Sequence, residues 1–125
     1  MTSNDPIIKK AVQFYHLGKL NLAATYCRNI LEADPNNHDV LHLLGTILND
    51  VGLSRQAKTI FEKAIHSSPA KLVTLTDYGF TLLYLGEYKN AINTFQIIIK
   101  TSPEHYQAWL GLGKAELAME NFGNA

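Results

Sequence analysis

Three prolines divide this chain at a fixed interval. Pro35, Pro69 and Pro103 stand 34 residues apart, and the residues between them repeat with the same period. A fixed period of this length is typical of a stack of identical supersecondary elements, each of which buries its apolar face against its neighbours. We therefore expect the function to lie in a surface built across several repeats.

The same period relates several other positions of each repeat. When the repeats are aligned, equivalent positions 34 residues apart form columns of similar residues. Glycine forms two such columns, alanine forms a third, and large apolar or aromatic residues form others. The columns are Gly18, Gly52 and Gly86; Gly45, Gly79 and Gly113; Ala23, Ala57, Ala91 and Ala125; Leu41, Leu75 and Trp109; and Cys27, Phe61 and Phe95.

Each repeat is predicted to contain two short helices. In the second repeat, apolar residues recur at intervals of three and four from Leu41 to Leu48, which is the spacing of one helical face. Gly52 then supplies a residue that can adopt a left-handed conformation and end the helix. Ser54 is the predicted N-cap of the next helix. That helix should stop before Pro69, because proline disfavours helical geometry in the residue ahead of it.

Small residues mark where the paired helices are expected to pack most closely. Gly45, Gly79 and Gly113 are predicted at the closest approach of the two helices of a repeat. Ala57 and Ala91 are predicted where the second helix crosses the first. A larger side chain at these positions would force the helices apart, and overpacking of this kind costs about 1–3 kcal/mol.

This pattern resembles the tetratricopeptide repeat, in which a large apolar residue precedes a Leu-Gly pair and then glycine, alanine, aromatic and proline positions. The resemblance implies an all-α fold, a right-handed superhelical solenoid of antiparallel helix pairs. It covers about residues 4–125, nearly the whole chain, and we expect residues 1–125 to form a single domain. The predicted repeats are about 4–37, 38–71 and 72–105, followed by a partial fourth at 106–125.

The fourth repeat departs from the pattern. Glu120 stands where the earlier repeats have glycine, although Phe122 and Ala125 fit the start of a second helix. We therefore expect the chain to be the N-terminal part of a longer protein with a natural N-terminus. We also expect Ala118, Met119 and Phe122 to lack a packing partner.

Composition argues against several classes of partner. Lys+Arg and Asp+Glu number 11 each, and nucleic-acid binding needs a cluster of phosphate-neutralising cations that is not visible here. The first six residues lack the basic start and apolar run of a signal peptide, so we expect none. The longest aliphatic cluster, residues 97–99, is far too short to span a membrane. The single cysteine, Cys27, is predicted to be a small buried hydrophobe in a reducing, cytoplasmic compartment.

The segment from His38 to His42 is the feature most like a metal site. Its two histidines, at positions i and i+4, share a helical face as in the zinc-protease pattern H-E-x-x-H. Asp39 is shorter than glutamate, however, no third ligand stands at a suitable spacing, and Leu41 is needed in the core. We therefore expect His38 to be a surface residue, and we expect no metal, no other cofactor and no catalytic residue. The other histidines are expected at the surface or rim: His16, His66 and His105.

The exposed side of the first helix of each repeat is the predicted binding face. On a helical wheel, residues of the third repeat form two groups, one centred on the core and one about 140° away. The resemblance implies that the second group lines a concave groove, and its apolar side chains are typical of an interaction site. The alternative is that neighbouring helices or a further C-terminal segment cover some of them. The predicted partner-binding groove consists of Ile8, Val12, Tyr15, His42, Thr46, Asn49, Val73, Thr76, Phe80, Leu83, Tyr84, Leu110 and Lys114.

Two kinds of ligand binding known in related repeats depend on side chains that this chain lacks. Family members that clamp a C-terminal carboxylate use basic and amide side chains, and O-linked N-acetylglucosamine transferases carry a ladder of asparagines. We expect neither mode here. The clamp positions hold Ile8, Val12, Leu43, Val73 and Asp77, and the ladder positions hold Lys9, Leu43, Asp77 and Gly111.

The sequence therefore predicts a non-catalytic scaffold that binds a protein or peptide ligand in its groove, with no role for nucleic acid or membrane. Two alternatives remain at this point. The chain could be the N-terminal, substrate-recruiting repeat region of a larger enzyme, such as a glycosyltransferase- or sulfotransferase-like protein. It could also be an assembly module that forms a homo-oligomer through its apolar groove or its open C-terminal end.

Overall fold

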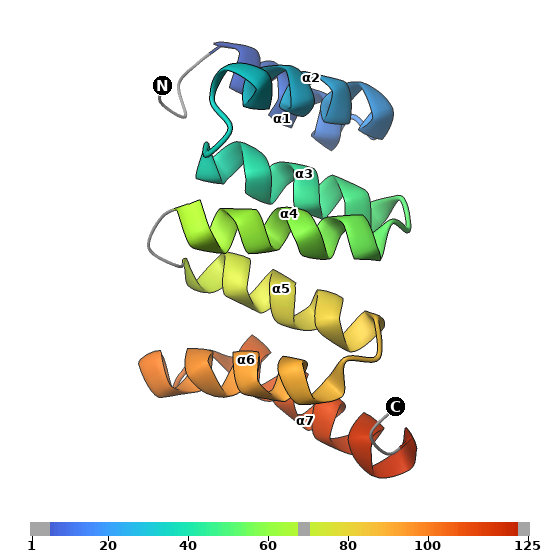
Figure 1. The fold of residues 1–125 in the computed structure, drawn as a ribbon, viewed down its shortest axis with the longest axis vertical. Coiled ribbons are helices and arrows are strands. Elements are labelled where there is room, and N and C mark those ends of the chain that lie inside the picture. The colour runs from blue at the N-terminus through green and yellow to red at the C-terminus, as the bar shows by residue number, and fades with distance from the viewer. Residues whose placement is uncertain (1–5, 68–70, 123–125) are drawn as a thin grey trace. The chain divides into compact units, whose positions relative to one another are not determined.

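The computed structural model describes residues 6–67 and 71–122, and these residues form seven α-helices and no strand (Figure 1). This confirms the predicted all-α fold. The chain divides into an N-terminal unit, residues 1–69, and a C-terminal unit, residues 70–125. The helices are α1 (Pro6–His16), α2 (Leu20–Ala33), α3 (His38–Asp50) and α4 (Ser54–Ser67) in the first unit, and α5 (Leu72–Tyr84), α6 (Tyr88–Thr101) and α7 (Tyr106–Phe122) in the second.

In the N-terminal unit, each helix packs against the next, so α1 contacts α2, α2 contacts α3 and α3 contacts α4. Consecutive helices run in opposite directions, as Figure 1 shows for α3 and α4. Ile65 of α4 is half-buried, whereas the other predicted core residues of the second repeat are buried. They are Leu41, Leu44, Gly45 and Leu48 on α3, and Ala57, Phe61 and Ala64 on α4.

Glycine ends the first helix of each complete repeat. Gly18, Gly52 and Gly86 have φ angles of 77°, 87° and 79°, in the left-handed region where a Cβ atom would clash. After α3, Gly52 donates its N–H to the carbonyl oxygen of Asn49 at 3.0 Å, and the chain turns directly into α4. The predicted helix ends are therefore confirmed.

The start of α4 differs from the prediction by one residue. Ser54 is the first residue of the helix rather than the residue ahead of it. The carbonyl oxygen of Leu53 accepts the N–H of Ala57 at 2.9 Å, so Leu53 occupies the capping position. Pro69, which was expected to stop α4, lies outside the described residues, and α4 ends at Ser67.

In the C-terminal unit, α6 packs against both α5 and α7, and α5 also contacts α7. Leu82 of α5, Phe95 and Ile98 of α6, and Ala108 and Ala115 of α7 form its buried core. Buried threonines occur among these apolar residues, and three of them donate their hydroxyl hydrogens to the carbonyl oxygen four residues earlier. They are Thr76 to Leu72 at 2.7 Å, Thr81 to Asp77 at 2.8 Å, and Thr94 to Asn90 at 2.9 Å.

The fourth repeat contains one long helix where the sequence predicted a turn. The helix α7 has 17 residues, against 13 in α3 and α5. Glu120 lies inside it at the position where the earlier repeats have glycine, because glutamate favours a helix interior and lacks glycine's access to positive φ. Phe122 is the last residue of α7 rather than the start of a second helix. Ala125 lies outside the described residues.

The expectation that Phe122 lacks a packing partner is also corrected. Its ring stacks on that of Tyr88, at the start of α6, with the two ring centroids 6.5 Å apart. The side chain is still mostly exposed, whereas Ala118 and Met119 are half-buried. The C-terminal turn of α7 is thus attached to α6 by one aromatic contact.

Candidate functional site

In the N-terminal unit, the predicted groove residues all lie on α1 and α3, two helices that contact each other. Val12 is exposed, and Tyr15 donates its hydroxyl hydrogen to Oδ2 of Asp50 at 3.0 Å, which joins the two helices. Ile8, in contrast, is buried in the core, so little of its side chain is accessible to a partner. The remaining three residues, His42, Thr46 and Asn49, are half-buried on α3.

In the C-terminal unit, the predicted groove residues lie on α5 and α7, which also contact each other. The exposed fractions are 79% for Tyr84, 53% for Val73 and 51% for Leu110, and Lys114 is exposed beside them. Thr76 is buried, and its Oγ1 lies 3.4 Å from Nε2 of His105, the residue directly ahead of α7. The helical wheel did not detect this, since it treats one helix at a time. The remaining two residues, Phe80 and Leu83, are half-buried.

Two of the half-buried groove residues contact aromatic residues of their own repeat. The Phe80 and Phe95 ring centroids lie 5.1 Å apart in an edge-to-face arrangement. The His42 and Phe61 ring centroids lie 5.9 Å apart. Each side chain therefore covers a core phenylalanine on one side and reaches the surface on the other, so intramolecular packing accounts for part of its apolar environment.

His105, expected at the rim, caps α7 and joins it to α5. The backbone N–H of Ala108 donates to Nδ1 of His105 at 3.3 Å, so Nδ1 is the unprotonated nitrogen. Nε2 then carries the hydrogen and lies 3.4 Å from Oγ1 of Thr76, whose own hydroxyl donates to Leu72. The clue in the sequence was the position of His105 directly ahead of the helical pattern, where capping residues occur.

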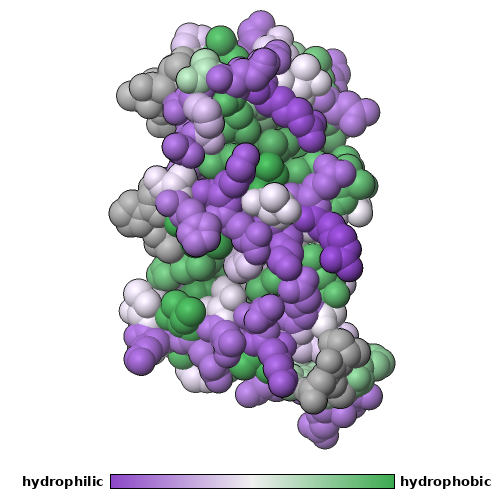
Figure 2. Space-filling view, viewed as in Figure 1, coloured by the Kyte–Doolittle hydropathy of each residue, from purple (hydrophilic) through white to green (hydrophobic). Residues whose placement is uncertain are grey.

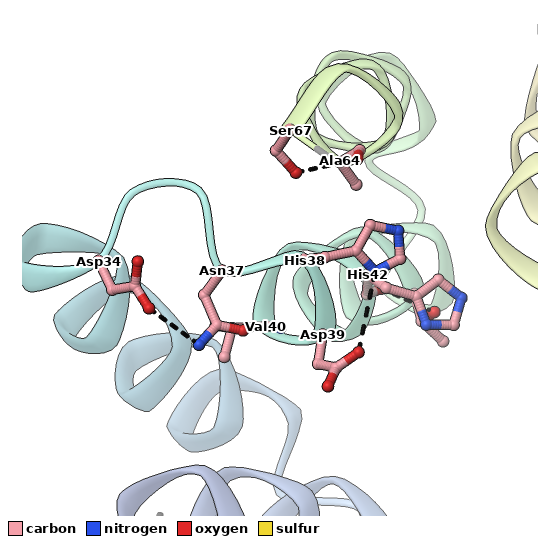
Figure 3. A network of polar contacts seen from close by, with 9 residues as sticks. Asp34, Asn37, His38, Asp39, Val40, His42, Ala64 and Ser67 are labelled. Atoms are coloured by element: carbon pink, nitrogen blue, oxygen red, sulfur yellow. Dashed lines mark hydrogen bonds and ion pairs between the residues drawn. The ribbon is translucent and has the colours of Figure 1, made fainter. Parts of the chain in front are cut away.

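The histidine segment of α3 is part of the start of this helix (Figure 3). Asn37 accepts the N–H of Val40 through Oδ1 at 3.1 Å and donates from Nδ2 to Asp34 at 3.2 Å, so it is the N-cap. Nδ1 of His38 lies 3.8 Å from Oδ1 of Asp39. The side chain of His38 is only 9% exposed, so the expectation of a surface residue is wrong.

Metal-ligating side chains do not gather in groups of three or more anywhere in the described residues. Cys27 is fully buried in α2, as predicted, and burial raises the pKa of its thiol to about 11. A thiol with this pKa is protonated and unreactive at neutral pH. Cys27 is therefore a core residue of its repeat.

The family assignment follows from two matches to models of known repeats. Both models are described as tetratricopeptide repeat, and they match residues 38–71 and 81–125, which together make up more than half of the chain. This chain belongs to the tetratricopeptide repeat family. The first match coincides with the second predicted repeat.

One of the similar curated proteins is named for the same repeat. Human Tetratricopeptide repeat protein 6 is 35% identical over 68 residues, which are 54% of this chain and 13% of that protein. Human Superkiller complex protein 3 is 26% identical over 112 residues, which are 90% of this chain and 7% of that protein. The chain therefore spans a small fraction of the length of these two relatives.

Solved structures share the tetratricopeptide repeat fold. One, described as the first TPR of Spaghetti (RPAP3) bound to the HSP90 peptide SRMEEVD, superposes with a TM-score of 0.86. It is 16% identical to this chain, and the match covers 91% of this chain and 90% of that one. At this identity, the likeness establishes the fold.

The surface of the repeats is mixed in character. On the face drawn in Figure 2, hydrophobic residues appear as patches between hydrophilic ones. Within the ranges that the structure covers, none of the helices has the length and hydropathy of a bilayer span.

Proposed function

We propose that this chain is a non-catalytic module that binds a polypeptide through the exposed face of α5 and α7. The proposal rests on the exposure of Tyr84 and Val73 on α5 and of Leu110 on α7, which are the first helices of the third and fourth repeats. Exposed apolar side chains that share one face are typical of interaction sites. The contact of Thr76 with His105 supports the adjacency of the two helices, and we propose on this basis that the three side chains form one surface.

The proposed ligand is an apolar polypeptide segment rather than an acidic C-terminal tail. The peptide bound to the RPAP3 repeat ends in the acidic sequence EEVD, and clamps for such tails rely on basic side chains. In this chain, the corresponding positions of α5 hold Val73 and Asp77. A carboxylate placed beside Asp77 would be repelled, whereas an apolar side chain would find Val73, Phe80 and Tyr84.

In the N-terminal unit, the equivalent face is formed by α1 and α3 and is more polar. Tyr15 and Asp50 hydrogen-bond to each other across α1 and α3, and the Thr46 hydroxyl donates to the carbonyl oxygen of His42 at 3.0 Å. These groups already have partners within the unit, so we propose that they set the orientation of a ligand more than its affinity. Val12 is the exposed apolar residue of this face.

The test is a titration with peptides selected from a random display library against the wild-type chain. We expect Tyr84→Ala and Val73→Ala each to weaken binding at least tenfold, because aromatic and apolar anchors dominate interface energies. The matched control is Ile97→Ala, which removes an equally exposed apolar side chain from the second helix α6. It should leave the affinity unchanged.

Binding should also depend only weakly on salt, because the anchors are uncharged. Equal affinity of wild type, Tyr84→Ala and Val73→Ala would contradict the proposal. So would a comparable loss in Ile97→Ala, or binding that moderate salt abolishes.

A further inference from the structure

The turn between α6 and α7 carries a serine directly ahead of a proline, Ser102-Pro103. Ser102 ends α6, because its N–H donates to the carbonyl oxygen of Ile98 at 2.8 Å while its own φ of −140° and ψ of 86° lie outside helical geometry. Its side chain is half-buried, and the neighbouring Thr101, Pro103 and Glu104 are exposed. The serine hydroxyl therefore reaches the surface in the Ser-Pro dipeptide that proline-directed protein kinases recognise.

The turn between α2 and α3 has the same backbone but carries an acidic residue. Asp34 occupies the position of Ser102 two repeats earlier, with a φ of −138° and a ψ of 76°. Its N–H donates to the carbonyl oxygen of Ile30 at 2.9 Å, and its side chain is also half-buried. The carbonyl oxygen of each of the two residues accepts the N–H three residues further on, from Asn37 at 3.2 Å and from His105 at 3.1 Å. This kind of turn thus accommodates an anionic side chain at the position of Ser102.

The Ser102 hydroxyl has one hydrogen-bond acceptor that a modification would remove. Oγ of Ser102 donates to Oε1 of Glu104 at 2.8 Å, and this hydrogen bond is the chief reason that the pKa of the Glu104 carboxyl lies below its ordinary value. A phosphate ester at Oγ has no hydrogen to donate there, and it adds a charge of about −1.5 to −2 at neutral pH. The Glu104 carboxylate would then be repelled, and because it is exposed it can turn into solvent.

We propose that Ser102 is a phosphorylation site for a proline-directed serine kinase. Oγ of Ser102 attacks the γ-phosphorus of ATP, its hydroxyl proton passes to a base of the kinase, and the bond to the β-phosphate oxygen breaks to release ADP. The product gives this turn the anionic side chain that Asp34 supplies permanently to the turn between α2 and α3. The carbonyl oxygen of Pro103 accepts the indole N–H of Trp109 at 2.7 Å, which keeps the turn attached to α7. The proposal does not rest on the proposed function.

The test incubates the folded full chain with a purified mitogen-activated protein kinase and ATP, and mass spectrometry of its peptides locates the phosphate. We expect phosphate on Ser102 and its loss from this peptide in Ser102→Ala. The matched control is Thr101→Ala, which removes the adjacent hydroxyl that no proline follows and should leave phosphorylation of Ser102 unchanged. The sequence has one other Ser-Pro dipeptide, at Ser68, which lies outside the described residues. Ser68→Ala should likewise leave the phosphate on Ser102.

Two further measurements test the effect on the turn. The pKa of the Glu104 carboxyl, followed by NMR, should rise on phosphorylation, because the carboxylate loses a hydrogen-bond donor and gains a negative neighbour. Ser102→Asp should melt close to wild type, because Asp34 occupies the equivalent turn. The absence of phosphate from Ser102 in the folded chain would overturn the proposal. An unchanged Glu104 titration after phosphorylation, or a large drop in the melting temperature of Ser102→Asp, would overturn it as well.

Discussion

The tip of the Phe95 ring lies against the backbone of Gly79, so closely that a Cβ atom on this glycine would stand 2.7 Å from Cε1 of the ring. The same ring tip meets Gly111 of α7, where an added Cβ atom would come closer still. Phe95 is fully buried, so it has little freedom to move away. One aromatic ring of α6 therefore limits how closely both α5 and α7 can pack against α6.

Alanine substitutions at two glycines of the same column should have opposite effects on stability. Gly79→Ala should destabilise the chain by about 1–3 kcal/mol, because the methyl group overpacks Phe95. Gly113→Ala should stabilise it by about 0.5–1 kcal/mol, because alanine is the better residue in a helix interior. Urea denaturation of both variants measures the free energies of unfolding. Changes of the same sign would show that the close contact of Gly79 does not limit packing.

The repeat period predicts contacts within a repeat better than contacts between repeats. It identified Gly45 and Gly79, whose partners lie in the second helix of the same repeat. It missed Gly111, because the equivalent positions hold Leu43 and Asp77, and because the partner of Gly111 belongs to the preceding repeat. Periodicity detects what every repeat shares, whereas only the fourth repeat has glycine at this position.

The predicted groove residues show the same difference between what one helix determines and what neighbouring helices add. The sequence placed Val73 and Tyr84 on the side of α5 opposite the core, and both side chains are exposed. It could not foresee that Thr76 is buried and lies against His105, or that Ile8 joins the core. A helical wheel gives the direction of a side chain from its own helix and contains no information about the helix beside it.

Removing the imidazole of His105 should destabilise the C-terminal unit. His105→Ala leaves the N–H of Ala108 without its side-chain acceptor, and the loss of a cap of this kind costs about 0.5–2 kcal/mol. His105→Asn should retain most of the stability, because asparagine is among the best N-cap residues. Thermal unfolding followed by circular dichroism compares the three proteins. Equal melting temperatures for His105→Ala and wild type would contradict the capping role.

His38→Ala should destabilise the N-terminal unit by about 0.5–3 kcal/mol, the usual range for a substitution at a buried position. The exposed His16 of α1 gives a matched control, and His16→Ala should be nearly neutral. A chelator should leave the unfolding transition of wild type unchanged, because two histidines on one helix make an incomplete metal site. A chelator-induced drop in melting temperature would instead support a metal bound by His38 and His42.

The buried thiol of Cys27 should make stability depend on pH in the alkaline range. Its pKa rises from 9.0 to about 11 on folding, chiefly because burial disfavours the thiolate. Above pH 9 the unfolded chain loses this proton while the folded chain keeps it, so the free energy of unfolding falls as pH rises from about 9 to 11. At 1.36 kcal/mol for each pKa unit, the loss attributable to Cys27 is about 2–3 kcal/mol.

The measurement is urea denaturation at several pH values for wild type and Cys27→Ala. Other groups that titrate in this range act on both proteins, so the difference between the two unfolding free energies isolates the thiol. This difference should be constant below pH 8 and should shift in favour of Cys27→Ala between pH 9 and 11. Parallel profiles across the whole range would mean that the thiol titrates equally in the folded and unfolded chains, and Cys27 would then be accessible to solvent in solution.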